Sequence, residues 1–194
     1  GLSLARAQRA PEAPELFWNG DHHSTFAFQL DNPDLDVETA HTLDLNWIWH
    51  SDQNEIRIAA YHYRFNDYIY NALQDNTDPY HSNDVYRHEQ EDARFTGAEA
   101  SWSHALTDTF TLDLGADTVR ATLANGDDLP RTPPTSLLVG LDWEFSQWQA
   151  RAEARAAAEQ SNTAENEDTS DGFMLLNASV GYQFVLADSE LNIS

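Results

Sequence analysis

Short turns and long acidic connections alternate along this chain of 194 residues. The short turns are Ser51–Asn54, Leu106–Asp108, Ser146–Gln147 and Ala187–Asp188. The long connections run over Ala10–Ala40, Gln74–Glu91, Ala124–Pro134 and Gln160–Gly172. A soluble β-sandwich has no reason to place every long connection at one end. An outer-membrane β-barrel does, because its turns are short on the periplasmic side and its loops are long outside.

The segments between these connections have the two-residue period of β-strands. In Thr42–His50, Leu45 and Trp47 fall on one face while Asp44 and Asn46 fall on the other. Eight further segments have a similar pattern, which predicts about nine strands, the first and last of them cut short. These segments are Leu2–Gln8, Glu55–Asn71, Asp92–His104, Phe110–Thr122, Ser136–Phe145, Trp148–Ala158, Phe173–Phe184 and Glu190–Ser194.

Aromatic residues gather beside the short turns, which predicts a girdle at one membrane interface. They are Trp47, Trp49, Trp102, Phe110, Trp143, Phe145, Trp148, Tyr182 and Phe184. Charged residues within the strands, such as Asp142 and Arg151, fall on the polar face. A water-filled lumen tolerates them there. We therefore expect an all-β fold, an antiparallel up-and-down transmembrane β-barrel segment.

Three local features are less clear-cut. The alanine-rich Trp148–Ala158 has helical propensity, but its charges alternate with a period of two, which favours a strand. In Glu55–Asn71 the apolar residues change parity, so that either a bulge lies near Ala59–Ala60 or both faces carry aromatic residues. A short turn of helix is expected within Ala10–Leu16.

Composition excludes several classes of function. The net charge of −23 makes nucleic acid a poor partner. It indicates a solvated exterior or loops that attract cations. There is no cysteine, and neither a signal-peptide pattern in Gly1–Arg9 nor an apolar run long enough for a membrane helix. No catalytic motif stands out, so we expect no enzymatic activity.

Ala5–Leu45, which contains ELF, a glycine-histidine loop and then NPDLDVET, resembles a signature of the TonB-dependent outer-membrane receptors. Other segments resemble later parts of the same barrel in the same order. They are YRFNDYIY (Tyr63–Tyr70), RFTGAEASWS (Arg94–Ser103), LPRTPPTSLLVGLDWEF (Leu129–Phe145) and FMLLNASVGYQF (Phe173–Phe184). The resemblance covers essentially the whole chain and is closest to the zinc-uptake branch.

The resemblance implies a 22-stranded barrel in the outer membrane of a Gram-negative bacterium, surrounded by lipid and lipopolysaccharide. It also implies a plug domain and uptake driven by the TonB complex. Residues 1–194 are expected to be part of this barrel domain, without the plug and the closing strands. The expected function is energised uptake of a metal ion or metal chelate. The alternatives are a passive porin or adhesin barrel, and a soluble acidic β-sandwich that binds a ligand.

Histidines and carboxylates in the first two long connections are candidate metal ligands, since imidazole and carboxylate suit zinc and similar ions. These candidates are Asp21, His22, His23, His81 and His88. Arg9, Tyr80 and Tyr86 are candidate contacts to an anionic or aromatic chelate. Exposed loop residues without a ligand are the alternative for all of them. No cofactor is required, and the transported species could be zinc, haem or a ferric siderophore.

Overall fold

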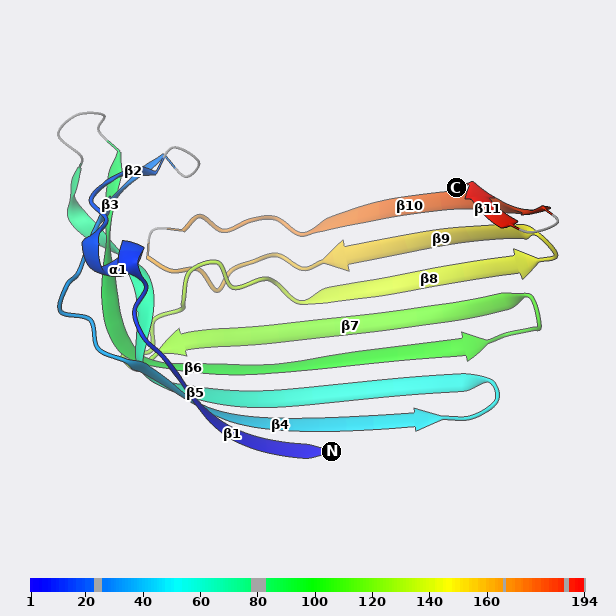
Figure 1. The fold of residues 1–194 in the computed structure, drawn as a ribbon, viewed down its shortest axis with the longest axis horizontal. Coiled ribbons are helices and arrows are strands. Elements are labelled where there is room, and N and C mark those ends of the chain that lie inside the picture. The colour runs from blue at the N-terminus through cyan, green and yellow to red at the C-terminus, as the bar shows by residue number, and fades with distance from the viewer. Residues whose placement is uncertain (23–25, 78–82, 166, 187–188, 194) are drawn as a thin grey trace.

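Antiparallel strands make up nearly the whole of the computed structural model (Figure 1), which describes residues 1–22, 26–77, 83–165, 167–186 and 189–193. They form one sheet in the order β1-β4-β5-β6-β7-β8-β9-β10-β11, and β2 and β3 lie off this path. The elements are β1 (Leu2–Arg9), α1 (Ala13–Phe17), β2 (Gly20–His22), β3 (Ala27–Leu30), β4 (Glu38–His50), β5 (Asn54–Thr77), β6 (Asp84–Ala105), β7 (Phe110–Leu123), β8 (Ser136–Phe145), β9 (Trp148–Ala157), β10 (Phe173–Leu186) and β11 (Ser189–Ile193).

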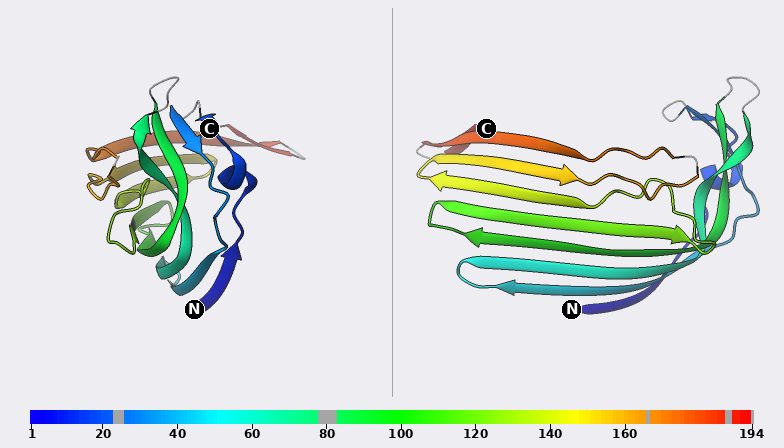
Figure 2. Two further views of the ribbon diagram at one scale, coloured as in Figure 1. Left: turned by 90° about the vertical axis from the view of Figure 1, so that its left-hand side faces the viewer. Right: turned by 180° about the vertical axis from the view of Figure 1, so that it is seen from behind.

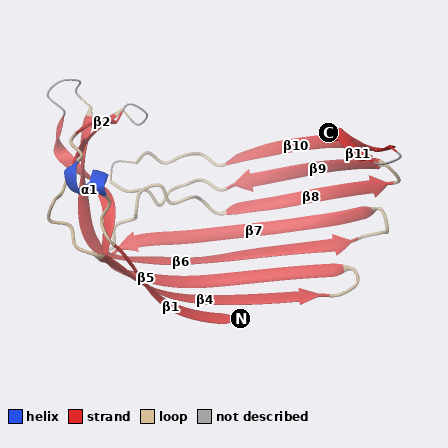
Figure 3. Ribbon diagram, in the orientation of Figure 1, coloured by secondary structure: helices blue, strands red, loops and turns tan. Residues whose placement is uncertain are grey.

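The nine-strand path confirms the up-and-down arrangement expected from the sequence. Viewed end-on the sheet is curved, and the short turns that join β4 to β5, β6 to β7 and β8 to β9 lie at one end (Figures 1 and 2). The segment over β9 is a strand rather than a helix, and α1 is the short helical turn expected after β1 (Figure 3). No helix among the described residues is both long and apolar enough to cross a membrane.

The second long connection is shorter than expected. Much of Gln74–Glu91 is strand, because β5 continues to Thr77 and β6 begins at Asp84. These outer halves carry polar residues on both faces, so their period is invisible in the sequence. They turn away from the plane of the sheet (Figure 1). The first connection also contains β2 and β3, and β3 pairs in parallel with the outer half of β6.

The two faces of the sheet differ in chemistry along its whole width. Residues directly opposite each other on neighbouring strands share a face. One such row crosses seven strands and consists of Trp49, Ile56, Trp102, Leu114, Val139, Ala154 and Leu176. Leu176 remains 73% exposed. This apolar face is therefore the one that meets lipid, and the opposite face is polar.

A single extra residue lies in β5 beyond the stretch in which the apolar residues change parity. The pairing of β5 with β6 shifts between Phe65 and Tyr68, and Asp67 adopts a left-handed conformation with φ of +56°. Ala59 and Ala60 stay in register, so a bulge near them is wrong. Before the shift Tyr61, Tyr63 and Phe65 share one face, and Ile56 and Ile58 lie on the other. After it, Tyr68 lies on the same side as Phe65, with ring centroids 5.1 Å apart.

An ionic cluster lies on the polar face of β7, β8 and β9. Arg151 Nη1 is 2.8 Å from Asp113 Oδ2 and also contacts Asp142, while Arg151 Nη2 is 3.0 Å from Glu153 Oε2. One cation thus neutralises carboxylates from three strands, which explains how charges are accommodated in the middle of strands.

Candidate ligand site at the loop end

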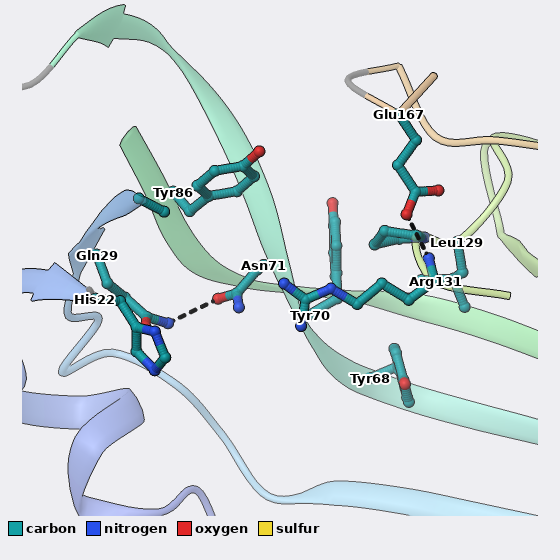
Figure 4. A pocket seen from close by; sticks show the side chains of 11 residues that line it. His22, Gln29, Tyr68, Tyr70, Asn71, Tyr86, Leu129, Arg131 and Glu167 are labelled. Atoms are coloured by element: carbon teal, nitrogen blue, oxygen red, sulfur yellow. Dashed lines mark hydrogen bonds between the residues drawn. The ribbon is translucent and has the colours of Figure 1, made fainter. Parts of the chain in front are cut away.

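A pocket of about 370 Å³ lies at the loop end of the sheet (Figure 4). Its walls come from the outer parts of β5 and β6, the β2–β3 hairpin and two later loops. The lining residues are His22, Ala27, Gln29, Tyr68, Tyr70, Asn71, Tyr86, Leu129, Pro130, Arg131 and Glu167. Cavities of this size hold small molecules.

A small buried cluster supports the tyrosines of the pocket. It consists of Ala93, Ala121, Leu123 and Leu129, with Phe65, Tyr68, Tyr70 and Phe95 packed against it. The ring of Tyr68 lies 5.4 Å from that of Phe95. Tyr68 and Tyr70 reach this cluster because the extra residue in β5 moves even-numbered positions to this side.

Burial controls the ionisation of both tyrosines. It raises the pKa of Tyr68, and the charge of Glu38 raises it further. Burial also raises the pKa of Tyr70, with smaller contributions from Glu89, Glu91 and Asp127. Both side chains are therefore neutral phenols at physiological pH. Each offers a ligand an aromatic face and an O–H donor.

The polar wall of the pocket is held by Gln29 on β3. The Gln29 side-chain amide donates to Asn71 Oδ1 at 2.9 Å, and its nitrogen lies 2.5 Å from His88 Nε2. Burial lowers the pKa of His88, an effect that the negative charge of Glu15 partly offsets. The unprotonated Nε2 of a neutral His88 can accept a hydrogen bond from the Gln29 amide, so the contact fixes β3 against β6.

Arg131 supplies positive charge from the loop after β7. Its backbone adopts a φ of +61°, and its N–H donates to Glu167 Oε1 at 2.6 Å. Its side chain reaches into the pocket (Figure 4). Arg131 and the three tyrosines give the pocket the chemistry to hold a planar, anionic ligand.

Arg9 lies away from this pocket, between two carboxylates. Its guanidinium is 2.9 Å from Glu15 and 3.4 Å from Glu38. Burial disfavours its charge, but the hydrogen bonds to Glu38 and Glu15 outweigh this and raise its pKa. Glu38 is only 8% exposed and accepts the Ile69 N–H at 3.0 Å. The group fastens the first long connection to β4 and β5.

The structure brings some of the candidate residues together. Asp21 and His22 are on β2, and His22 lines the pocket with Tyr86. His88 contacts Gln29 at the polar wall. His23, Tyr80 and His81 lie outside the described residues. Within the described part of the chain, no three histidines or carboxylates are arranged to hold a metal ion.

Sequence reasoning did not single out Gln29, Asn71, Arg131 or Glu167 as site residues. Gln29 and Asn71 belong to strands that were expected to be loop or to have unclear phase. Arg131 follows Leu129-Pro130 in a connection rich in proline. Its positive charge in so acidic a chain is the one sequence feature that could have marked it as a site residue.

Comparisons with known proteins agree on one family. The family model described as TonB dependent receptor-like, beta-barrel matches residues 2–194. The copper transporter OprC is 23% identical with a TM-score of 0.83, covering 98% of this chain and 29% of its own length. The siderophore receptor PirA from Pseudomonas aeruginosa is 16% identical with a TM-score of 0.68, and the match covers 95% of this chain and 33% of PirA. The ferric enterobactin receptor PfeA, in complex with BCV-L6, is 18% identical with a TM-score of 0.70, and the match covers 98% of this chain and 31% of PfeA.

Proposed function

Because the chain belongs to the TonB-dependent receptor family, as a part of its outer-membrane β-barrel, we propose that its receptor takes up a metal chelate through the pocket at the loop end. Receptors of this family are transporters rather than enzymes and reside in the Gram-negative outer membrane. The chain spans about a third or less of the solved receptors it resembles. Uptake is therefore proposed for the whole receptor.

The proposal rests on one observation: a single cavity of about 370 Å³ is lined by three tyrosines and an arginine, namely Tyr68, Tyr70, Tyr86 and Arg131. A bare ion needs only a few close ligand atoms, whereas this cavity has room for a small organic molecule. Aromatic faces stack on planar groups, and a guanidinium binds carboxylate or phenolate oxygens. A ferric siderophore with aromatic metal-binding groups fits these walls best, and haem is a second chelate with a flat face and carboxylates.

A metal ion is the second candidate, and the position of His22 in the pocket favours it. Asp21 on β2 and His88 on β6 belong to the same region, with strand β3 between them, and His23 and His81 are the remaining candidate ligands. Zinc is the ion suggested by imidazole with carboxylate, and the similarity in fold to a copper transporter adds copper.

Energy for transport is proposed to come from the TonB complex through a plug domain in the receptor's lumen. The polar face of this sheet, with the ionic cluster around Arg151, is the surface that such a plug would contact. A passive porin or adhesin would have no need of that coupling, so loss of uptake in a strain without the TonB complex separates these functions.

The test uses the full-length receptor in detergent, titrated with a ferric catecholate siderophore, haem, Cu²⁺ and Zn²⁺ while tryptophan fluorescence is recorded. Tyr70→Ala should lower the receptor's affinity for the chelate by about tenfold. Tyr70→Phe should retain most of the wild-type affinity because the ring remains. Arg131→Gln should also cost about tenfold. Arg57→Gln is the matched control, since Arg57 is exposed on the polar face far from the pocket.

Heat-modifiable gel migration first establishes that each variant is folded. If Tyr70→Ala and Arg131→Gln bind every chelate as the wild type does, the pocket is not the ligand site. If Cu²⁺ or Zn²⁺ binds instead and His22→Ala abolishes binding, the metal-ion function replaces the chelate.

A further inference from the structure

Basic residues line up on the apolar face where the sheet nears its loop end. In the pairing of β1, β4, β5 and β6, Arg6 lies opposite His41, His41 opposite Arg64, and Arg64 opposite Arg94. Directly opposed residues share a face, so these four side chains form one continuous line, called here the basic row. All four are exposed.

The basic row marks the edge of the lipid-facing band. Two residues nearer the short turns, the same strands carry Leu4, Leu43, His62 and Thr96. Two residues further again they carry Leu2, Leu45, Ala60 and Ala98. The face thus changes from apolar to cationic within two rows, at the height where lipid headgroups begin.

The concentration of charge runs against the composition. The chain has 33 acidic residues and only ten basic ones, all of them arginine. Arg6, Arg64 and Arg94 lie in the basic row, and Arg120 lies opposite Thr96 in the adjacent row. Neither row contains an acidic residue. The first carboxylate farther out on this face of β6 is Asp92, two positions beyond Arg94.

The cations of the basic row lack acidic partners within the described chain. Arg120 pairs with Asp128 at 2.9 Å, but Arg6, Arg64 and Arg94 form no ion pair with any described residue. Arg64 Nε instead donates to His62 Nε2 at 3.2 Å. Like charges directly opposite each other on neighbouring strands destabilise a sheet. An anion from outside the chain would remove this cost.

An apolar groove lies directly beneath these cations. It has a volume of about 730 Å³, and its lining includes Leu2, Leu43, Leu45, Ala60 and Ala98 together with His62, Thr96, Thr118 and Arg120. The groove exists because the small side chains of Ala60 and Ala98 leave a hollow next to leucines on β1 and β4. Its shape and chemistry suit a hydrocarbon chain.

We propose that the basic row and this groove bind an acylated, phosphorylated lipid of the outer leaflet. Arg6, Arg64 and Arg94 hold its phosphates, and an acyl chain lies in the groove below. A guanidinium and a phosphate form short, charge-assisted hydrogen bonds. The site faces outward from the barrel, so it is separate from the ligand pocket and does not depend on the transported species.

The test compares lipid binding by the full-length receptor, using lipopolysaccharide and the same material after its lipid A phosphates have been removed. The double variant Arg64→Gln with Arg94→Gln should lose about ten- to thirtyfold in affinity for the phosphorylated lipid. It should bind the dephosphorylated lipid as the wild type does. Arg57→Gln is the matched control, because Arg57 lies on the same strand but on the polar face.

A second pair of variants separates charge and groove from general damage. Arg64→Lys with Arg94→Lys keeps both charges and should restore most of the affinity, even where the glutamine variant folds poorly. Ala98→Phe fills the groove and should lower the receptor's affinity for the intact lipid. If the wild type binds both lipids equally, or if the folded glutamine double variant binds the phosphorylated lipid normally, the proposal is overturned.

Discussion

Arg151 on β9 lies 2.8 Å from a carboxylate oxygen of Asp113 on β7, although strand β8 runs between them. The arginine crosses over Gly140, the β8 residue directly opposite Asp113. A Cβ at position 140 would lie 2.6 Å from Arg151 Nη2. The missing side chain at Gly140 is therefore what allows a cation to neutralise a carboxylate two strands away.

Replacing Gly140 should break this bridge. Gly140→Val is expected to destabilise the full-length receptor by roughly 1–3 kcal/mol, because the guanidinium is displaced and Asp113 is left unpaired. The measurement is the urea midpoint from tryptophan fluorescence in detergent. Gly115→Ala is the control, since its added Cβ would meet Leu138 at an ordinary 3.5 Å. An unchanged midpoint in Gly140→Val would show that the bridge is not needed.

The register of β5 beyond Asp67 should determine whether the pocket exists. Inserting one alanine between Asp67 and Tyr68 would turn Tyr68 and Tyr70 to the opposite face, because a shift of one residue reverses every side chain beyond it. We expect a folded barrel that has lost chelate binding. Asp67→Gly should bind normally, since glycine adopts the left-handed conformation without strain. Retained binding in the insertion variant would contradict this account.

The contact between Gln29 and His88 should weaken in acid. Burial lowers the pKa of His88 below its ordinary value of 6.5. Above pH 6.5 His88 is neutral whether β3 is docked or free. As the pH falls from 6.5 to the lowered pKa, the free form takes up the proton first, so docking loses stability. Amide exchange of Ala27–Leu30, corrected for intrinsic rates, should therefore speed up at pH 5.5.

His88→Gln provides the control for this pH dependence. A glutamine does not titrate, so protection of Ala27–Leu30 should be the same at pH 5.5 and pH 7.5 after correction. If the wild type also shows no difference, protonation of His88 does not govern the docking of β3.

Glu38 should hold the first long connection in place. Glu38→Ala removes the acceptor of the Ile69 N–H and one of the two carboxylates at Arg9, which should cost about 2 kcal/mol locally. Limited proteolysis should then cut residues 10–37 faster. Glu38→Gln keeps an acceptor and should show a smaller effect. Equal cutting of all three proteins would mean that the connection is held elsewhere.

The strands of the barrel wall could be predicted because their two sides differ so sharply. Leu43, Leu45 and Trp47 must face lipid, and Asp44 and Asn46 must avoid it. The outer halves of β5 and β6 and the strands β2 and β3 could not be predicted, because polar and apolar residues are mixed on both of their sides. The position of the bulge was equally hidden, since it depends on Asp67 adopting a positive φ opposite Asp92.

The pocket was only partly predictable for a related reason. Its residues come from connections that are far apart in the sequence, and β3 pairs with β6 in parallel across fifty-seven positions, Ala27 with Asp84. His22 and Tyr86 could be chosen by residue type alone. Arg9 was chosen in the same way, and its pairing with Glu15 and Glu38 depends on how the first connection folds back.

The distance between the aromatic girdle and the basic row sets the thickness of the lipid layer that this sheet can match. From Trp49 to His41 there are eight steps along β4, or about 27 Å at roughly 3.4 Å per residue. A strand tilt of about 40° reduces this to a vertical span of about 21 Å. That is less than the ~25 Å band typical of outer-membrane barrels. Lipids beside this part of the wall must therefore thin or tilt to avoid hydrophobic mismatch, which favours short acyl chains here.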